Sequence, residues 1–315
     1  MKKILALIMA LCMVLGCTAA LAEGETYNVG IIQLVQHVAL DAATQGFQDA
    51  LTELLGDKVK FDLQNASGDA ATCATIANGF VSNEVDLIMA NATAALQAAV
   101  AATGDIPVLA TSITDYGTAL DIEDWTGVTG INVSGTCDLA PLDQQAAIIK
   151  ELFPDAKNIG LIYCSAEPNS FYQVTTIAGY LAELGYETTM FPFADSNDLA
   201  SVTQSACDAA DVLYIPTDNT AASYTETVYN VVQPAGKPVV AGEEGICNGC
   251  GVATLTIDYY DLGYATGKMA YEVLVNGADV STMAVEFAPQ FTKKYNPTIA
   301  AELGITIPEG YEAIE

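Results

Sequence analysis

The segment Tyr27–Phe47, YNVGIIQLVQHVALDAATQGF, predicts a β-strand that leads directly into an α-helix. Its apolar run Asn28–Ile32 stops at the polar side chain of Gln33. From Ala39 onward, alanine, leucine and phenylalanine recur near helical spacing, which is typical of an amphipathic helix. This strand-then-helix unit decides the fold, because it recurs along the rest of the chain.

Later strand-like runs also stop on small polar residues before a helix-like stretch. The clearest of them are Asp86–Ala90, Ile106–Ala110, Ile159–Tyr163, Val212–Pro216 and Pro238–Gly242. Strands that alternate with helices join through βαβ crossovers into parallel sheets. The pattern blurs over 114–135 and then restarts, which indicates a boundary between two lobes. Since parallel sheets bind ligands at the carboxyl ends of their strands, each lobe should present a binding edge.

The chain is strongly acidic: its formal net charge at pH 7 is −29, and it contains no arginine. Such a surface repels phosphate backbones, so the composition argues against nucleic acid as a partner. Without arginine there is no bidentate clamp for a carboxylate or a phosphate. An anionic ligand group must therefore be held by lysine, by hydroxyl groups or by backbone N–H groups.

The N-terminus predicts an export signal over residues 1–22. Two lysines precede the apolar run Ile4–Leu15, which is too short to span a membrane. Val14–Cys17 resembles a lipobox, in which Cys17 would carry a lipid anchor, whereas Ala20–Ala22 resembles an ordinary cleavage site. Both alternatives stay open, so we expect an exported protein that is either lipid-anchored at the cell surface or soluble outside the cytoplasm.

Six cysteines follow this segment: Cys73, Cys137, Cys164, Cys207, Cys247 and Cys250. Export permits disulfides, but the spacing does not give their pairing. Cys247–Cys250 is a CxxC segment without the second CxxC or the histidine that a zinc site needs, which favours a short-loop disulfide or two buried thiols. No Walker, G-x-S-x-G or H-E-x-x-H motif occurs. We therefore expect no metal, no cofactor and no enzymatic activity.

Polar side chains at the predicted strand ends are the candidate ligand contacts. His37 stands in the loop after the first strand, where it can reach a ligand. Hydroxyls and helix-terminal N–H groups at Asn91–Thr93 and Ser112 suit a carboxylate. Asp218 and Glu243, in the second half, suit an ammonium group. Helix capping is the alternative role for these side chains. A hydroxyl-rich edge that faces an acidic edge predicts a zwitterionic ligand.

Six stretches of the chain carry a family resemblance. They are Asn28–Phe47, Asp86–Thr93, Ala110–Tyr116, Lys157–Ser170, Val212–Ala221 and Gly242–Gly267. In combination they resemble the substrate-binding proteins of ABC importers of the tryptophan/tyrosine type, and the likeness covers nearly all of the chain beyond the export signal. The chain departs from the family at Val38, where the family usually has proline after the histidine.

The resemblance implies a type I periplasmic-binding fold, in which two doubly wound parallel-sheet α/β lobes are joined by a hinge of three chain crossings. It assigns residues 25–133 and 258–280 to the first lobe and residues 134–257 and 281–315 to the second. By position it implies ligand contacts from both lobes, namely Gln33, His37, Asn91, Thr93, Ser112, Glu167, Asn169, Ser170, Asp218, Asn219 and Glu243.

The resemblance also implies a function as an exported receptor. The implied ligand is an amino acid, with the aromatic ones (Trp, Tyr or Phe) favoured, and closure of the lobes would bury it. The implied partner is an ABC permease with its cytoplasmic ATPase. The alternative is an extracellular ligand-sensing domain that serves a signalling partner.

Overall fold

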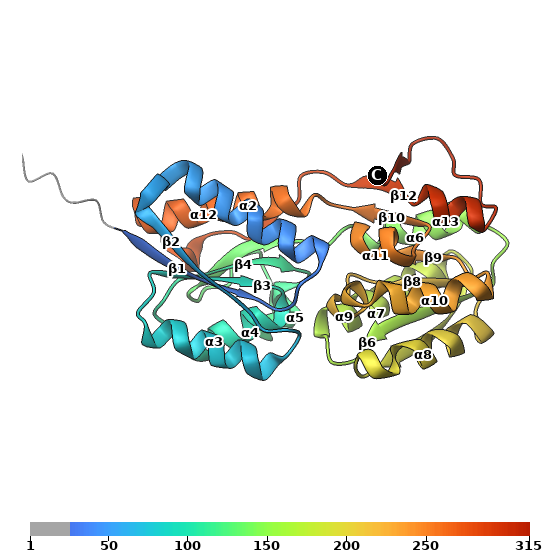
Figure 1. The fold of residues 1–315 in the computed structure, drawn as a ribbon, viewed down its shortest axis with the longest axis horizontal. Coiled ribbons are helices and arrows are strands. Elements are labelled where there is room, and N and C mark those ends of the chain that lie inside the picture. The colour runs from blue at the N-terminus through green and yellow to red at the C-terminus, as the bar shows by residue number, and fades with distance from the viewer. Residues whose placement is uncertain (1–25) are drawn as a thin grey trace, which may run out of the picture.

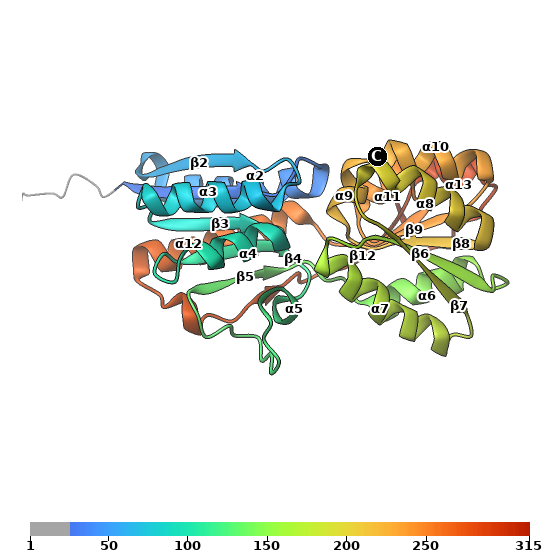
Figure 2. The ribbon, with the colours of Figure 1, turned by 90° about the horizontal axis from the view of Figure 1, so that it is seen from below.

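The computed structural model describes residues 26–315. In that part the chain forms two α/β lobes that lie end to end, as the sequence predicts (Figure 1, and Figure 2 from below). The expected export signal and Cys17 lie outside the described residues. No helix within residues 26–315 is long and apolar enough to cross a membrane.

The first lobe is built on a six-stranded sheet with the order β11-β5-β4-β3-β1-β2, in which every pairing is parallel. Its strands are β1 (Tyr27–Gln33), β2 (Val59–Asn65), β3 (Leu87–Asn91), β4 (Val108–Ile113), β5 (Val133–Cys137) and β11 (Glu286–Phe287). Its helices are α2 (Val38–Leu55), α3 (Ala70–Ser82), α4 (Thr93–Ala102), α5 (Tyr116–Leu120) and α12 (Tyr259–Asn276), with short 3-10 turns η1 (Gly56–Lys58) and η2 (Val280–Thr282).

Side chains of β1 alternate between the two faces of this sheet. Val29 and Ile31 pack into the cluster that α2 and α12 cover, whereas Ile32 packs into the cluster that α3 and α4 cover. Figure 1 shows α2 and α12 on one side of the sheet and α3 and α4 on the other. Both faces are therefore buried, which is the usual state of a parallel sheet.

The second lobe is built on a seven-stranded sheet with the order β13-β12-β10-β9-β8-β6-β7. Its strands are β6 (Asn158–Cys164), β7 (Glu187–Phe193), β8 (Val212–Ile215), β9 (Val239–Ala241), β10 (Ala253–Thr256), β12 (Thr292–Tyr295) and β13 (Glu312–Ala313). Its helices are α6 (Leu142–Leu152), α7 (Pro168–Glu183), α8 (Ser196–Ala209), α9 (Asn219–Ser223), α10 (Thr225–Ala235), α11 (Glu244–Cys250) and α13 (Pro297–Glu302). The sheet is parallel except at β12, which runs antiparallel to β10.

The chain passes between the lobes after β5, between β10 and α12, and between β11 and β12. The expected boundaries at Val133 and at 280 are therefore corrected: β5 and β11 both belong to the first sheet. Strand β5 was not predicted because it contains small polar residues in place of a continuous apolar run. Ser134 and Thr136 are buried there because their hydroxyls bond to the Met283 carbonyl and to the hydroxyls of neighbouring threonines.

Helix α2 packs closely against α12, the helix that follows the second crossing. A Cβ atom at Gly263 would lie 1.9 Å from the Ala43 carbonyl oxygen, and one at Gly46 would lie 2.1 Å from the Tyr260 carbonyl oxygen. Only glycine permits backbones to approach this closely. Since α12 begins directly after the crossing, this contact sets the position of the α2 N-terminus relative to the hinge.

Candidate functional site

The carboxyl ends of the two sheets face each other between the lobes, and the sequence-predicted contact residues all lie at these ends. From the first lobe they are Gln33, His37, Asn91, Thr93 and Ser112. From the second lobe they are Glu167, Asn169, Ser170, Asp218, Asn219 and Glu243. The fold thus gathers both predicted edges into one cleft, although the side chains in it do different things.

A side-chain hydrogen bond joins the lobes across the cleft. His37 Nε2 lies 3.2 Å from Asn219 Oδ1, and Asn219 Nδ2 donates to Glu167 Oε2 at 2.8 Å. Because the amide oxygen can only accept, the bond requires a proton on Nε2. Burial lowers the pKa of His37, against the hydrogen bond to Asn219 and the charge of Glu167, which raise it. This hydrogen bond brings the two lobes into contact at the cleft.

Residues on either side of His37 line two different cavities. Leu34–Gln36 face a cavity of about 860 Å³, which α4 of the first lobe and Glu167 of the second lobe also line. Val38 faces a second cavity of about 790 Å³, which lies beside the second and third crossings and is also lined by Ile257 and Pro289.

Gln33 and Thr44 form a buried network that holds the start of α2. Gln33 Nε2 donates to Asp41 Oδ1 at 2.6 Å and to the Val35 carbonyl at 3.0 Å, and its Oε1 accepts from the Thr44 hydroxyl at 2.7 Å. Asn91 Nδ2 donates to Thr44 Oγ1 at 3.0 Å. The Gln33 amide therefore forms its hydrogen bonds within the first lobe, where it positions the start of α2.

Three buried polar atoms at the edge of the first sheet have no hydrogen-bond partner within the described chain. They are Asn91 Oδ1, Ser112 Oγ and Asp138 Oδ1. They stand at the carboxyl ends of β3, β4 and β5, which are neighbours in the sheet. Buried polar atoms are nearly always paired, so a row of three unpaired ones at the carboxyl edge of the first sheet indicates a place for polar ligand groups.

The backbone at this edge is strained and offers free donors. Ala92 has φ of 85° and Ser112 has φ of 57°, a region that non-glycine residues rarely adopt and that recurs at functional sites. Ala92 is the N-cap of the ten-residue helix α4, and it has no side chain that could cap the helix. The first-turn N–H groups of α4, starting at the buried Thr93, therefore favour an anion.

Glu167 is saturated by hydrogen bonds from its own lobe. Its Oε1 accepts from the N–H and hydroxyl of Thr220, and its Oε2 accepts from the N–H and Nδ2 of Asn219 and from Nδ2 of Asn169. Asn169 also donates to the Thr217 carbonyl. Glu167 therefore ties the start of α7 to the start of α9 and leaves little capacity for a ligand.

Asp218 and Glu243 are N-caps, the alternative that the sequence left open. Asp218 accepts from the N–H groups of Cys164 and Ala221 at 2.6 and 2.8 Å. Burial, with a smaller contribution from Glu167, raises its pKa to about 8, while the backbone bonds and the Ser170 hydroxyl oppose the shift. Glu243 accepts from the N–H groups of Gly245 and Ile246, and burial raises its pKa to about 7. Their role as ligand contacts stays a prediction.

Sequence reasoning missed Asp138. Asp138 follows β5 at the first crossing and is buried; its Oδ2 accepts from the Tyr259 hydroxyl at 3.0 Å. Burial raises the pKa of Asp138 to about 6. The sequence feature that could have identified Asp138 is an acidic residue directly after a strand. It was not recognised because β5 consists mostly of small polar residues and does not resemble a strand in sequence.

The six cysteines that the structure describes are all free and buried. Cys247 and Cys250 lie on α11, and burial is the largest cause of the raised pKa of both thiols. In residues 26–315 no group of three or more His, Cys, Asp or Glu side chains is arranged to hold a metal ion. Of the alternatives for the CxxC segment, the structure has the two buried thiols.

Comparisons with known proteins agree with this geometry. The family model of ABC transporter substrate binding proteins matches residues 28–313. A tyrosine-binding protein from Clostridioides difficile is 38% identical over 294 residues, which cover 87% of this chain and 84% of that protein.

Two solved structures share 36% of their sequence with this chain. One, from Streptococcus pneumoniae in complex with L-Trp, superposes with a TM-score of 0.88 over 92% of this chain and 100% of the other. The second is a ligand-free, open substrate-binding protein with adhesive properties from Clostridium difficile, with a TM-score of 0.70 over 92% and 99%. The first match confirms the expected fold.

Proposed function

The chain belongs to the family of ABC transporter substrate-binding proteins, as its sequence predicts, and we propose that it binds an amino acid, an aromatic one above all, between its lobes. An ABC permease then takes the ligand, after export of the receptor to the outside of the cytoplasm. Family membership does not favour the alternatives, an enzyme or a sensor domain for a signalling partner.

One observation carries this proposal: the row of unpaired polar atoms on β3, β4 and β5 stands beside the uncapped N-terminus of α4. An α-amino acid offers a carboxylate and an ammonium group a short distance apart. The carboxylate suits the first-turn N–H groups of α4 and the Ser112 hydroxyl, which need no arginine. The ammonium group suits an acid at the edge.

The cavity of about 860 Å³ supports a large side chain in the ligand. It adjoins α4 through Ala94 and is lined by the apolar Leu34 and Val35 and by Tyr224 of the second lobe. In the sheet order, β1 and β2 lie on one side of β3 and β5 lies on the other. An amino acid whose carboxylate sits at α4 can therefore extend an aromatic ring toward β1 and its ammonium group toward β5. An aromatic ligand is also consistent with the names of two relatives, a tyrosine-binding protein and a complex with L-Trp.

A thermal-shift screen of the amino acids, with glucose and adenosine as controls, tests the ligand class. A ligand that binds the folded state stabilises it by about 2.7 kcal/mol at 100 times its dissociation constant. We expect Trp, Tyr or Phe to raise the Tm most. The proposal is wrong if every amino acid leaves the Tm unchanged while a sugar or nucleoside raises it.

A further inference from the structure

We infer, on the basis of the proposed function, that Asp138 on the first crossing and Glu243 of the second lobe together hold the ammonium group of the amino acid. A residue that binds the ligand would thus lie on one of the three chain segments that connect the lobes. The sequence pointed to Asp218 and Glu243 for this role and did not indicate Asp138.

Asp138 is the acid in the cleft with an unused oxygen. Its side chain is buried, Oδ2 accepts from the Tyr259 hydroxyl, and Oδ1 accepts no hydrogen bond of normal geometry within the described residues, although the Thr114 hydroxyl lies close enough to lower the pKa of the carboxyl. Burying a carboxylate oxygen without a partner is costly, and the cost disappears if a cationic N–H group donates to it. In Asp218 and in Glu243 each oxygen already accepts one backbone N–H group, so Asp138 is the one of these three acids that keeps an oxygen without a partner.

Glu243 approaches the same place from the opposite lobe. Glu243 and Tyr259 both line the cavity of about 790 Å³ beside the crossings, and the Tyr259 hydroxyl donates to Asp138 Oδ2 at 3.0 Å. Burial is the main cause of the raised pKa of Glu243 and of Tyr259, and the charge of Asp138 adds to both shifts. Two buried acids and a tyrosine hydroxyl thus share one region between the lobes. The other titratable groups whose pKa Asp138 raises are Tyr116 on α5 and Cys137, and neither of them supplies a positive charge.

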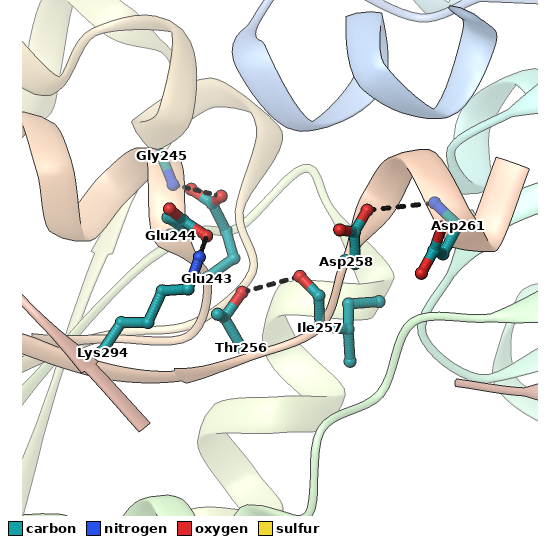
Figure 3. A network of polar contacts seen from close by, with 8 residues as sticks. All are labelled: Glu243, Glu244, Gly245, Thr256, Ile257, Asp258, Asp261 and Lys294. Atoms are coloured by element: carbon teal, nitrogen blue, oxygen red, sulfur yellow. Dashed lines mark hydrogen bonds and ion pairs between the residues drawn. The ribbon is translucent and has the colours of Figure 1, made fainter. Parts of the chain in front are cut away.

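No cation of the described chain balances this pair of acids. The ion pairs within residues 26–315 are Lys293–Glu151 and Lys294–Glu244, and both lie at partly exposed side chains. Figure 3 shows Lys294 bound to Glu244, whereas Glu243 bonds to the N–H of Gly245. A buried acid pair is strongly unfavourable unless a cation joins it, and the ammonium group of an amino acid is such a cation.

This placement couples binding to closure. Asp138 lies on the first crossing and Tyr259 opens α12 after the second, so their hydrogen bond joins two of the three connections. An ammonium group held by both Asp138 and Glu243 adds a contact between the lobes. A ligand shifts a conformational equilibrium only through contacts that one state makes and the other lacks.

The test uses L-tryptophan and indole-3-propionate, which lacks only the amino group. By titration calorimetry at pH 8, Asp138→Asn should weaken L-tryptophan binding at least about thirty-fold, in line with the loss of a buried charge pair. It should leave indole-3-propionate unchanged or tighter. Asp261→Asn, which removes an exposed charge from the first turn of α12, is the matched control and should leave both affinities unchanged.

The wild-type protein provides a second readout that needs no variant. Lowering the pH from 8 to 5 protonates Asp138 and Glu243, so L-tryptophan binding should weaken while indole-3-propionate binding should strengthen. Tyr259→Phe removes a donor that lowers the pKa of Asp138, and should move the midpoint of the wild-type profile to higher pH.

Three outcomes overturn the inference. Equal weakening of both ligands by Asp138→Asn means that Asp138 only supports the fold. Wild-type affinity of the variant for L-tryptophan, or a flat pH profile in the wild type, means that another group holds the ammonium. If the wild type binds no amino acid at all, the proposed function has failed, and the inference fails with it.

Discussion

Carboxyl groups at the cleft differ in what their oxygens contact, and this decides which of them can bind a ligand. Glu167 receives five hydrogen bonds from its own lobe, and Asp218 receives two from backbone N–H groups. Asp138 keeps one oxygen without a partner. Glu167 and Asp218, whose oxygens are all paired, hold loops in place. Asp138, with one unpaired oxygen, is stabilised when a cation binds to it.

The buried cysteines allow a prediction at the same scale. Burial raises the pKa of Cys73 and Cys164 to about 11 and holds the pKa of the other four thiols above the usual value, so few thiolates form at pH 8. We expect the native protein, purified without its export segment, to react negligibly with Ellman's reagent at pH 8. All six thiols should react after unfolding.

A reducing agent provides the control for the thiol prediction. A disulfide typically contributes about 2–4 kcal/mol to stability. If dithiothreitol lowered the Tm of the protein, or if fewer than six thiols reacted after unfolding, at least one disulfide would be present and the description of free thiols would be wrong.

At the scale of elements, the uncapped helix α4 explains how a chain without arginine can hold a carboxylate. Its N-cap Ala92 leaves the first-turn N–H groups without a side-chain partner, and Ser112 stands at the neighbouring strand end. Tryptamine, which is L-tryptophan without the carboxylate, should therefore bind at least about tenfold more weakly, since charged hydrogen bonds contribute about 1.5–3 kcal/mol. Competition calorimetry measures the ratio, and equal affinity for tryptamine would show that nothing at this edge reads the carboxylate.

A serine pair separates the contact at this edge from general stability. Ser112→Ala should reduce the preference for L-tryptophan over tryptamine, because the hydroxyl that faces the carboxylate is lost. Ser134→Ala on the adjacent strand β5 removes a hydroxyl that bonds to Met283 inside the first lobe. It should lower the Tm but keep the preference, and an equal effect of the two variants would argue against a ligand contact at Ser112.

The sequence predicts elements best where strands are apolar. The runs that became β3, β4, β6 and β8 are identifiable because their side chains are buried on both faces. Strand β5 was not recognised, since its buried hydroxyls are satisfied by partners distant in sequence. For the same reason Asp138 escaped notice, and Glu167 was placed among the ligand contacts although α9 occupies its oxygens. Which carboxylate stays unpaired depends on how the loops fold, and local sequence does not record it.

At the scale of the whole molecule, the two lobes lie against each other, and the bond from His37 to Asn219 joins them across the cleft. His37→Ala should weaken the closed state by about 1 kcal/mol, the usual net value of one hydrogen bond. Ligand dissociation, measured by stopped-flow fluorescence, should become about fivefold faster. Gln45→Ala, at an exposed position on the same helix α2, is the matched control. An unchanged dissociation rate in His37→Ala would remove this contact from the mechanism of closure.

The proposed amino-acid receptor is tested most directly by calorimetric titration of the purified protein with L-tryptophan and L-tyrosine at pH 8. The account predicts saturable binding of at least one of them with one ligand per chain, because the described residues place one row of unpaired polar atoms at the edge of the first sheet, beside the N-terminus of α4. Glucose should give no binding signal. Absence of binding for both amino acids, or binding of more than one ligand per chain, would contradict the account.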